Sequence, residues 1–261
     1  MNIGVKLLPH IPAPEIVLFR ALVSLIVCYV MVRKAGLKPW GNNKRDLILR
    51  GLTGTIALIM YFYTLQHMPL ASAVTLIQLS PIFTITIAGF MLREPPRAIQ
   101  WLFFAVSFAG VVMVKGFDPR VSVTDAGLGV AAAFFAGLAY NFIRKLKNRD
   151  HPLVVVLYFP LVTVPIVGLY SLTNWVQPGL TDWLILIGIG LVTTVAQIYM
   201  TKAYQSDRAA NVSNYSYLQV VLGILVGLFI FNESIDVLGM TGILLIVVGV
   251  VLSSRFGRIS A

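Results

Sequence analysis

Residues 71–94 read ASAVTLIQLSPIFTITIAGFMLRE. No charged side chain occurs in this stretch before Arg93. A helix rises 1.5 Å per residue, so about 20 mostly apolar residues cross the roughly 30 Å hydrocarbon core of a bilayer. The run is unbroken and lacks the alternating pattern of a barrel strand. The stretch therefore predicts a membrane-spanning helix that ends at a charged loop.

Stretches of this kind fill most of the chain. Hydrophobic residues make up 58% of the 261 and charged residues only 11%, which is too little charge to cover the surface of a water-soluble domain. The sequence predicts an all-α integral membrane protein with no room for a soluble domain of ordinary size. We expect nine full spans, at about 13–32, 47–66, 71–92, 99–114, 126–142, 153–172, 183–200, 209–231 and 237–254.

The loops alternate between cation-rich and cation-poor. Most of the 20 Lys and Arg residues lie after the first, third, fifth, seventh and ninth spans. Cytoplasmic loops carry the excess of Lys and Arg, so we expect a multi-pass protein of the inner or plasma membrane with a cytoplasmic C-terminus. The net charge of +10 is then explained by cations that face anionic membrane lipid. We expect no nucleic-acid partner, because the cations form no patch with interleaved aromatic residues.

The chain also repeats itself at a distance of 139 residues. The repeat carries three matched positions, which are Ala71 and Ala210, Glu94 and Glu233, and Gly110 and Gly249. The loop around Glu94 holds Arg93 and Arg97, whereas residues 232–236 around Glu233 hold no cation. Equivalent loops are thus expected on opposite sides of the membrane, which requires an odd number of spans in each repeat. Two antiparallel bundles of five helices satisfy this condition.

Ten helices are required by this scheme, and nine full spans are found. Residues 1–8 are apolar but too short to cross, and we interpret them as a remnant of the first helix in a chain that begins late, through a misplaced start or a natural truncation. The expected domains are a first repeat at 1–117, with its first helix mostly missing, and a second repeat at 124–255. Inverted repeats are the usual basis of alternating access, which favours a transporter.

Further motifs point to a family. PEIVLFR at 14–20 opens the first full span, Pro81 precedes Glu94 by thirteen residues, and FAGVV at 108–112 and VGVV at 248–251 lie in the helices that close the two halves. With these motifs the chain resembles the drug/metabolite transporter superfamily, specifically proteins with two EamA-type domains of five helices. The resemblance implies secondary transport of small organic metabolites, by export or uptake. The chain departs from the family in its short first helix and in Val220, where a Pro is often found.

Arg20 is the sharpest candidate for substrate contact. An Arg inside a span costs about 2.5–3.5 kcal/mol on insertion scales, so such residues usually face a watery cavity or an acidic partner. In a cavity, Arg20 would anchor a substrate carboxylate or phosphate. The alternatives are that it reaches to the outer interface or pairs with Glu15.

Polar side chains recur every three or four residues on several spans, and such stripes either hydrogen-bond to neighbouring helices or line a pore. We favour the pore for the stripe in 209–231. Together with Arg20, the predicted substrate-binding residues are Gln78, Tyr140, Asn141, Gln197, Asn211, Asn214, Tyr215 and Gln219. Arg144 follows Tyr140 and Asn141 on one helix face and suits an inner gate, although a plain topology charge explains it equally. Pro81 is a candidate hinge or a static bend.

The sequence contains no catalytic set. His10, His67 and His151 lack metal-ligand spacing, and no phosphate-cradling Gly loop is present, so we expect neither an enzyme nor a bound cofactor or metal. One alternative is a truncated, non-transporting relative or assembly partner. A membrane-bound transferase is a weaker one, because it would need clustered His or acids at one interface. Gly223 and Gly227 predict close helix contact, within the bundle or in a homodimer.

Overall fold

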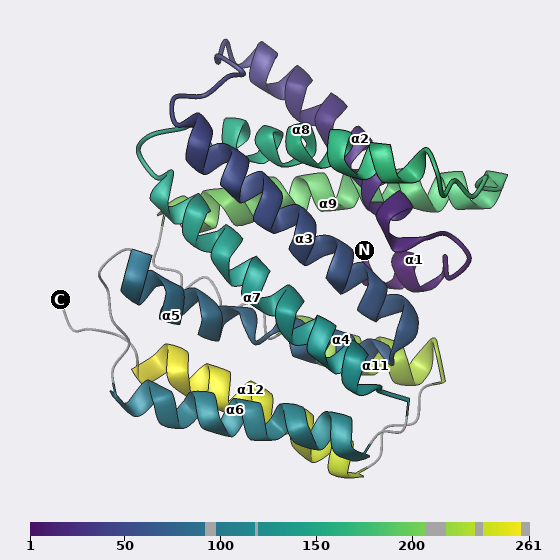
Figure 1. The fold of residues 1–261 in the computed structure, drawn as a ribbon, viewed down its shortest axis with the longest axis vertical. Coiled ribbons are helices and arrows are strands. Elements are labelled where there is room, and N and C mark those ends of the chain that lie inside the picture. The colour runs from purple at the N-terminus through teal and green to yellow at the C-terminus, as the bar shows by residue number, and fades with distance from the viewer. Residues whose placement is uncertain (92–97, 118–119, 207–217, 233–236, 257–261) are drawn as a thin grey trace. The chain divides into compact units, whose positions relative to one another are not determined.

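The computed structural model describes all residues except 92–97, 118–119, 207–217, 233–236 and 257–261 (Figure 1). Within the described residues, all regular secondary structure is helical. The helices are α1 (Asn2–Lys6), α2 (Ala13–Lys34), α3 (Lys44–His67), α4 (Leu70–Ile77), α5 (Ser80–Met91), α6 (Ala98–Phe117), α7 (Val123–Lys145), α8 (Pro152–Ser171), α9 (Leu180–Ser206), α11 (Leu218–Phe229) and α12 (Val237–Phe256).

Six segments of the described chain are long and apolar enough to cross a membrane. They are Ala13–Lys34, Lys44–His67, Leu70–Met91, Val123–Lys145, Pro152–Ser171 and Leu180–Ser206. Each corresponds to one of the predicted spans, because a long uncharged stretch leaves the backbone no other means of satisfying its hydrogen bonds in lipid. The other three predicted spans contain residues whose side chains the structure does not describe. The chain is a multi-pass membrane protein.

The chain divides into two compact units, and each contains helices from both predicted repeats. Unit 1 comprises Met1–Gln66 and Phe142–Asp207, and unit 2 comprises His67–Asn141 and Arg208–Ala261. The predicted domains at 1–117 and 124–255 are repeats along the sequence, whereas the two units are groups of helices that pack together. Helices far apart in the chain are therefore neighbours within each unit.

In unit 1, α2 packs against both α8 and α9 (Figure 1). The contact with α9 is close because Gly190 presents no side chain, and a Cβ there would lie 2.6 Å from Cβ of Val23. The helix α2 begins where Pro12 and Pro14 supply the fixed backbone angle that suits a first turn. These contacts bury Ile16, Val17 and Arg20 on α2.

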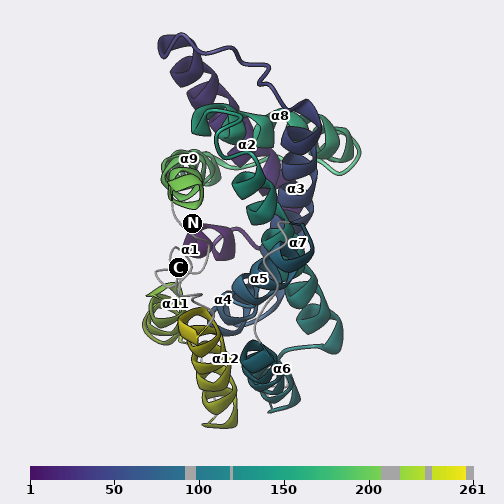
Figure 2. The same cartoon turned by 90° about the vertical axis from the view of Figure 1, so that its left-hand side faces the viewer.

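In unit 2, α6 and α12 run alongside each other in both views (Figures 1 and 2), and α4 packs against α11. The α6–α12 contact is close at Gly110 and Gly249. A Cβ on Gly110 would lie 2.6 Å from the carbonyl oxygen of Gly242, and a Cβ on Gly249 would lie 2.7 Å from that of Phe103.

The predicted span at 71–92 is interrupted in its middle. The helix α4 ends at Ile77 with Gln78 as its C-cap, and α5 begins at Ser80. Pro81 has no N–H to donate to the Ile77 carbonyl oxygen four residues earlier, so a continuous helix would lack that bond. The interruption lies where the sequence predicts a bend at Pro81.

Candidate functional site

Arg20 lies in the interior of unit 1 and is only 6% exposed. Its Nε donates to Oγ1 of Thr193 at 2.9 Å, and its guanidinium carbon lies 5.2 Å from the ring centroid of Phe159. Thr193 in turn donates to the carbonyl oxygen of Ile189. The Arg20 side chain therefore points between α2, α8 and α9. The carboxylate of Glu15, the alternative partner for Arg20 in the sequence analysis, accepts from the backbone N–H of Val176 at 3.1 Å.

A second buried arginine shares the same aromatic ring. Arg50 on α3 is 3% exposed, and its guanidinium carbon lies 5.0 Å from the ring centroid of Phe159. Guanidinium groups within about 6 Å of a ring centroid are attracted to the ring's negative face. Arg20, Arg50 and Phe159 thus form a cluster, here called the arginine cluster, that places two cations against one ring.

Arg50 is a residue that the sequence analysis missed as a site candidate. The charge pattern assigns Arg50 to the cation-rich loop after the first span, whereas α3 begins at Lys44 and carries Arg50 in its second turn. The sequence does indicate a buried position for Arg50, because the predicted span at 47–66 includes it.

Hydroxyl pairs surround the arginine cluster. Oγ of Ser24 and Oγ1 of Thr194 lie 2.6 Å apart between α2 and α9, and Oγ1 atoms of Thr55 and Thr163 lie 2.6 Å apart between α3 and α8. All four residues are buried. Buried polar groups need such partners because an unsatisfied one costs about 1–3 kcal/mol. The interior of unit 1 therefore contains hydrogen-bonded polar pairs among its apolar side chains.

One end of unit 1 gathers the loops that carry many of its cations. The carboxylate of Asp150 accepts from the backbone N–H groups of Asn42 at 2.5 Å and Asn43 at 3.1 Å, and Lys145 Nζ lies 3.0 Å from Asp46. These contacts join the loops at 35–43 and 146–151, and Gln205 at the end of α9 joins them by donating to the Asp150 carbonyl oxygen. We call this region, residues 35–46, 145–152 and 202–206, the cation-rich end.

The opposite end of unit 1 joins loops that are poor in cations. Nε2 of Gln66 donates to the carbonyl oxygens of Leu8 and Ile11, both at 2.9 Å. His10 Nε2 lies 3.0 Å from the Asp182 carboxylate. Loops that the charge pattern assigns to one side of the membrane are therefore together at one end of the unit.

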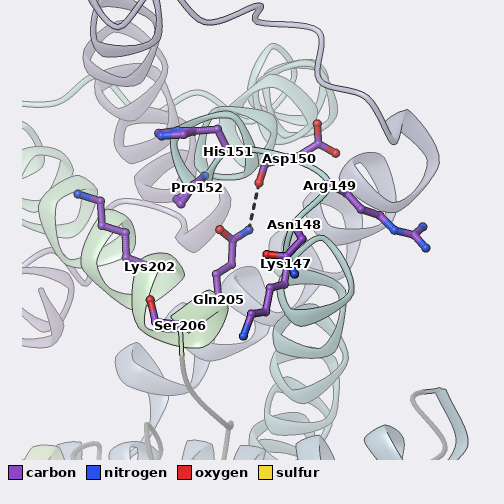
Figure 3. A pocket seen from close by; sticks show the side chains of 9 residues that line it. All are labelled: Lys147, Asn148, Arg149, Asp150, His151, Pro152, Lys202, Gln205 and Ser206. Carbon is purple, nitrogen blue, oxygen red and sulfur yellow. Dashed lines mark hydrogen bonds between the residues drawn. The ribbon is translucent and has the colours of Figure 1, made fainter.

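A polar pocket of about 440 Å³ opens at the cation-rich end (Figure 3). It is lined by Lys147, Asn148, Arg149, Asp150, His151, Pro152, Lys202, Gln205 and Ser206. These residues come from the turn between α7 and α8 and from the last turn of α9. Figure 3 shows Gln205 bridging the two segments through its bond to Asp150.

Among the described residues of unit 2, the predicted site residues Gln78 and Asn141 lie at or beside the helices α4 and α5. Gln78 is buried there. Asn141 is also buried, and its Nδ2 donates to the carbonyl oxygens of Thr84 and Gly137, both at 2.9 Å. The Asn141 amide thus braces α7 against α5. Tyr140 precedes it and is half-buried.

The remaining predicted residues are spread more widely. Gln197 is half-buried on α9 in unit 1, and Arg144 is half-buried near the end of α7. Asn211, Asn214 and Tyr215 lie outside the described residues, and Gln219 lies in the part of α11 whose side chains are not described. In the described part of the chain, no three His, Cys, Asp or Glu side chains are grouped so that they could hold a metal ion.

Comparisons with known proteins identify a transporter family. The EamA-like transporter family matches residues 2–116 and 126–255. The pseudopaline exporter CntI of Pseudomonas aeruginosa is 33% identical over 251 residues, which cover 94% of this chain and 87% of the exporter. The riboflavin transporter of Vibrio cholerae is 26% identical, covering 85% of this chain and 76% of that protein.

A human relative and a solved structure extend the comparison. Human solute carrier family 35 member G1 is 30% identical, covering 89% of this chain and 68% of that protein. A crystal structure with 19% sequence identity superposes with a TM-score of 0.70, covering 95% of this chain and 90% of the other. At that identity the superposition shows a shared fold.

Proposed function

Because the chain belongs to the EamA-like transporter family, we propose that it carries a metabolite with a carboxylate or phosphate group by alternating access between two inverted repeats. The family and the named relatives are transporters rather than enzymes, and the protein is a secondary transporter of small organic metabolites. The geometry described above supports the acidic group, the inverted repeats and the residues proposed to bind substrate.

Helix bounds support the duplication. The helices α6 (Ala98–Phe117) and α12 (Val237–Phe256) are separated by 139 residues at both ends. The same separation relates the first residues of α2 and α8, Ala13 and Pro152, and the last residues of α3 and α9, His67 and Ser206. The separation matches the sequence repeat, so we assign the two repeats to residues 1–117 and 124–255.

Contacts between α6 and α12 support the inversion. Gly110 approaches Gly242 and Ile246, and its equivalent Gly249 approaches Phe103 and Ser107. Adding 139 to 103 and 107 gives 242 and 246, so the two sets of contacts are reciprocal. Residue numbers rise along one helix as they fall along the other, which means that equivalent helices run antiparallel. Such a relation is expected of two repeats with a two-fold axis in the membrane plane.

The two ends of unit 1 support the sidedness. Lys and Arg concentrate in cytoplasmic loops, and the loops at 35–43 and 146–151 meet at one end through Asp150. We therefore propose that the cation-rich end is cytoplasmic. The C-terminus follows a predicted span that begins outside, so it too is cytoplasmic in this scheme.

The arginine cluster supports an acidic substrate. An arginine at the centre of a membrane span costs about 2.5–3.5 kcal/mol on insertion scales, and a contact with an aromatic ring returns up to about 2 kcal/mol when desolvated. A bound carboxylate or phosphate would stabilise both cations further, since it accepts paired hydrogen bonds from guanidinium groups. We propose that Arg20 and Arg50 bind the acidic group of the substrate.

Other residues complete the proposed route. The stripe of Asn211, Asn214, Tyr215 and Gln219 is proposed to line it, together with Gln78 and Gln197. Tyr140, Asn141 and Arg144 are proposed to form an inner gate, with the interruption at Pro81 as the flexible point. The hydrogen bonds of Asn141 to α5 favour a gate that moves as part of the α5–α7 contact.

The test is transport by purified protein in proteoliposomes, with a panel of acidic, neutral and basic metabolites, with and without a pH gradient. We expect the transported compounds to be acidic, and Arg20→Gln and Arg50→Gln to abolish their transport without preventing membrane insertion. Arg33→Gln is the matched control, because Arg33 is an exposed residue at the end of the same helix as Arg20. Unchanged transport by Arg20→Gln would contradict the anchoring role. A wild type that moves nothing would favour the non-transporting relative.

A further inference from the structure

The pocket at the cation-rich end lies at the ends of two helices that could cross a membrane. It is formed where α8 begins at Pro152 and where α9 ends at Ser206, and both helices are long and apolar enough to span a bilayer. The 20 residues of α8 measure about 30 Å, the thickness of the hydrocarbon core alone. With α8 across the bilayer, the residues just before it lie at the depth of the lipid phosphate groups, and the last turn of α9 lines the same pocket.

The charge of the pocket is positive. Lys147, Lys202 and His151 are exposed. In Figure 3 the side chains of Lys202 and His151 extend to one side and that of Arg149 to the other, and the Lys202 Nζ lies 5.7 Å from the ring centroid of Tyr199. Among the described residues that line it, Asp150 is the one acid. Its carboxylate is turned away from the pocket, toward the backbone N–H groups before α3, and only its carbonyl oxygen faces Gln205.

Two further side chains of the pocket, those of His151 and Gln205, can hydrogen-bond to a ligand. His151 Nδ1 accepts from the backbone N–H of Leu153 at 3.3 Å, so a hydrogen on this ring belongs on Nε2, which is free to donate to a ligand. Gln205 is 9% exposed, and its Nε2 donates to the Asp150 carbonyl oxygen at 3.4 Å. That bond leaves the Gln205 Oε1 as the acceptor on the pocket side, where Figure 3 shows it.

We propose that this pocket binds the head group of an anionic phospholipid. Lys147, Lys202 and the Nε2 of His151 contact the phosphate oxygens, and Oε1 of Gln205 accepts from a hydroxyl group of the head group. The volume of about 440 Å³ is large enough for a phosphate and a small polyol. A lipid bound in this way links the turn before α8 to the end of α9. This site is separate from the arginine cluster and does not depend on the identity of the transported metabolite.

The experiment measures lipid binding to the purified full-length protein by native mass spectrometry. The probes are dioleoylphosphatidylglycerol, dioleoylphosphatidylcholine as the zwitterionic counterpart, and inorganic phosphate as the free anion. The test variant is Lys147→Gln with Lys202→Gln. The control is Lys34→Gln with Lys38→Gln, which removes the same charge from exposed positions at the end of α2 and in the loop that follows it.

We expect wild type to retain phosphatidylglycerol in preference to phosphatidylcholine. Loss of a hydrogen bond to a charged phosphate weakens binding about tenfold, so the test variant should bind phosphatidylglycerol about 100-fold more weakly. The control should bind as wild type does. Equal weakening in both double variants would overturn the proposal, because it would indicate diffuse attraction. No preference for phosphatidylglycerol in wild type would overturn it too, as would displacement of the lipid by millimolar inorganic phosphate, which would identify a site for the free ion.

Discussion

Replacing Gly110 or Gly249 by Ala should separate α6 from α12. A Cβ on Gly110 would lie 2.6 Å from the Gly242 carbonyl oxygen and 2.9 Å from the Ile246 nitrogen. A Cβ on Gly249 would meet Oγ of Ser107 and would lie 2.7 Å from the Phe103 carbonyl oxygen. Favourable contacts begin near 3.5 Å, so the helices must part by roughly 0.8 Å in either variant. Rotation of a side chain cannot relieve the contact with a backbone atom.

The magnitude follows from two opposing effects. Overfilling a packed contact costs typically 1–3 kcal/mol, and exchanging Gly for Ala inside a helix returns about 0.5–1 kcal/mol. Each variant should therefore be less stable than wild type by up to about 2.5 kcal/mol. Because the contacts are reciprocal, the two substitutions should have similar effects.

Thermal unfolding of the purified variants in detergent measures this prediction. Gly127→Ala on α7 and Gly188→Ala on α9 are the controls, since a Cβ at either position has no neighbour within 4 Å. They should be as stable as wild type or up to about 1 kcal/mol more stable. The reasoning is wrong if Gly110→Ala behaves like these controls, or if the effects at Gly110 and Gly249 differ by more than about 1 kcal/mol.

Two further predictions concern single side chains. Phe159→Leu should keep most of the volume but remove the ring that lies against both guanidinium groups, at a cost of about 0.5–2 kcal/mol for each contact. Thermal unfolding should show a larger loss of stability than in the control Phe62→Leu, which removes a buried ring from α3. Equal losses of stability in the two variants would argue against the arginine cluster. Asn141→Leu should destabilise the protein by about 1–3 kcal/mol, because the Thr84 carbonyl oxygen loses its bond from α7. An Asn141→Leu protein with wild-type stability would show that the brace contributes little.

The helices could be predicted from the sequence because lipid imposes a simple length requirement. An uncharged run such as 71–92 must be helical to satisfy its own backbone, and the observed segment Leu70–Met91 differs from it by one residue at each end. The interruption at Pro81 was also readable, since a missing N–H is a local property. The sidedness, the repeats and the roles of the site residues stay predictions.

Packing between distant helices was not readable in the same way. Nothing local in the sequence indicates that Phe159 will lie against Arg20 and Arg50, because one Phe in an apolar span resembles any other. In the sequence Asp150 is one acid in a basic loop, and its role depends on the backbone N–H groups of Asn42 and Asn43, which lie more than 100 residues away in the chain. The mixing of both repeats within each compact unit likewise depends on tertiary contacts.

The central claim is that the two repeats are inverted in the membrane, and labelling of single cysteines tests it most directly. Cys28 is the one cysteine of the chain, so Cys28→Ser gives a background for Glu94→Cys and Glu233→Cys. A membrane-impermeant maleimide, applied to right-side-out and to inverted vesicles, reports the side of each position. The account predicts that position 233 is labelled from outside and position 94 from the cytoplasm. Labelling of both positions from the same side would contradict it.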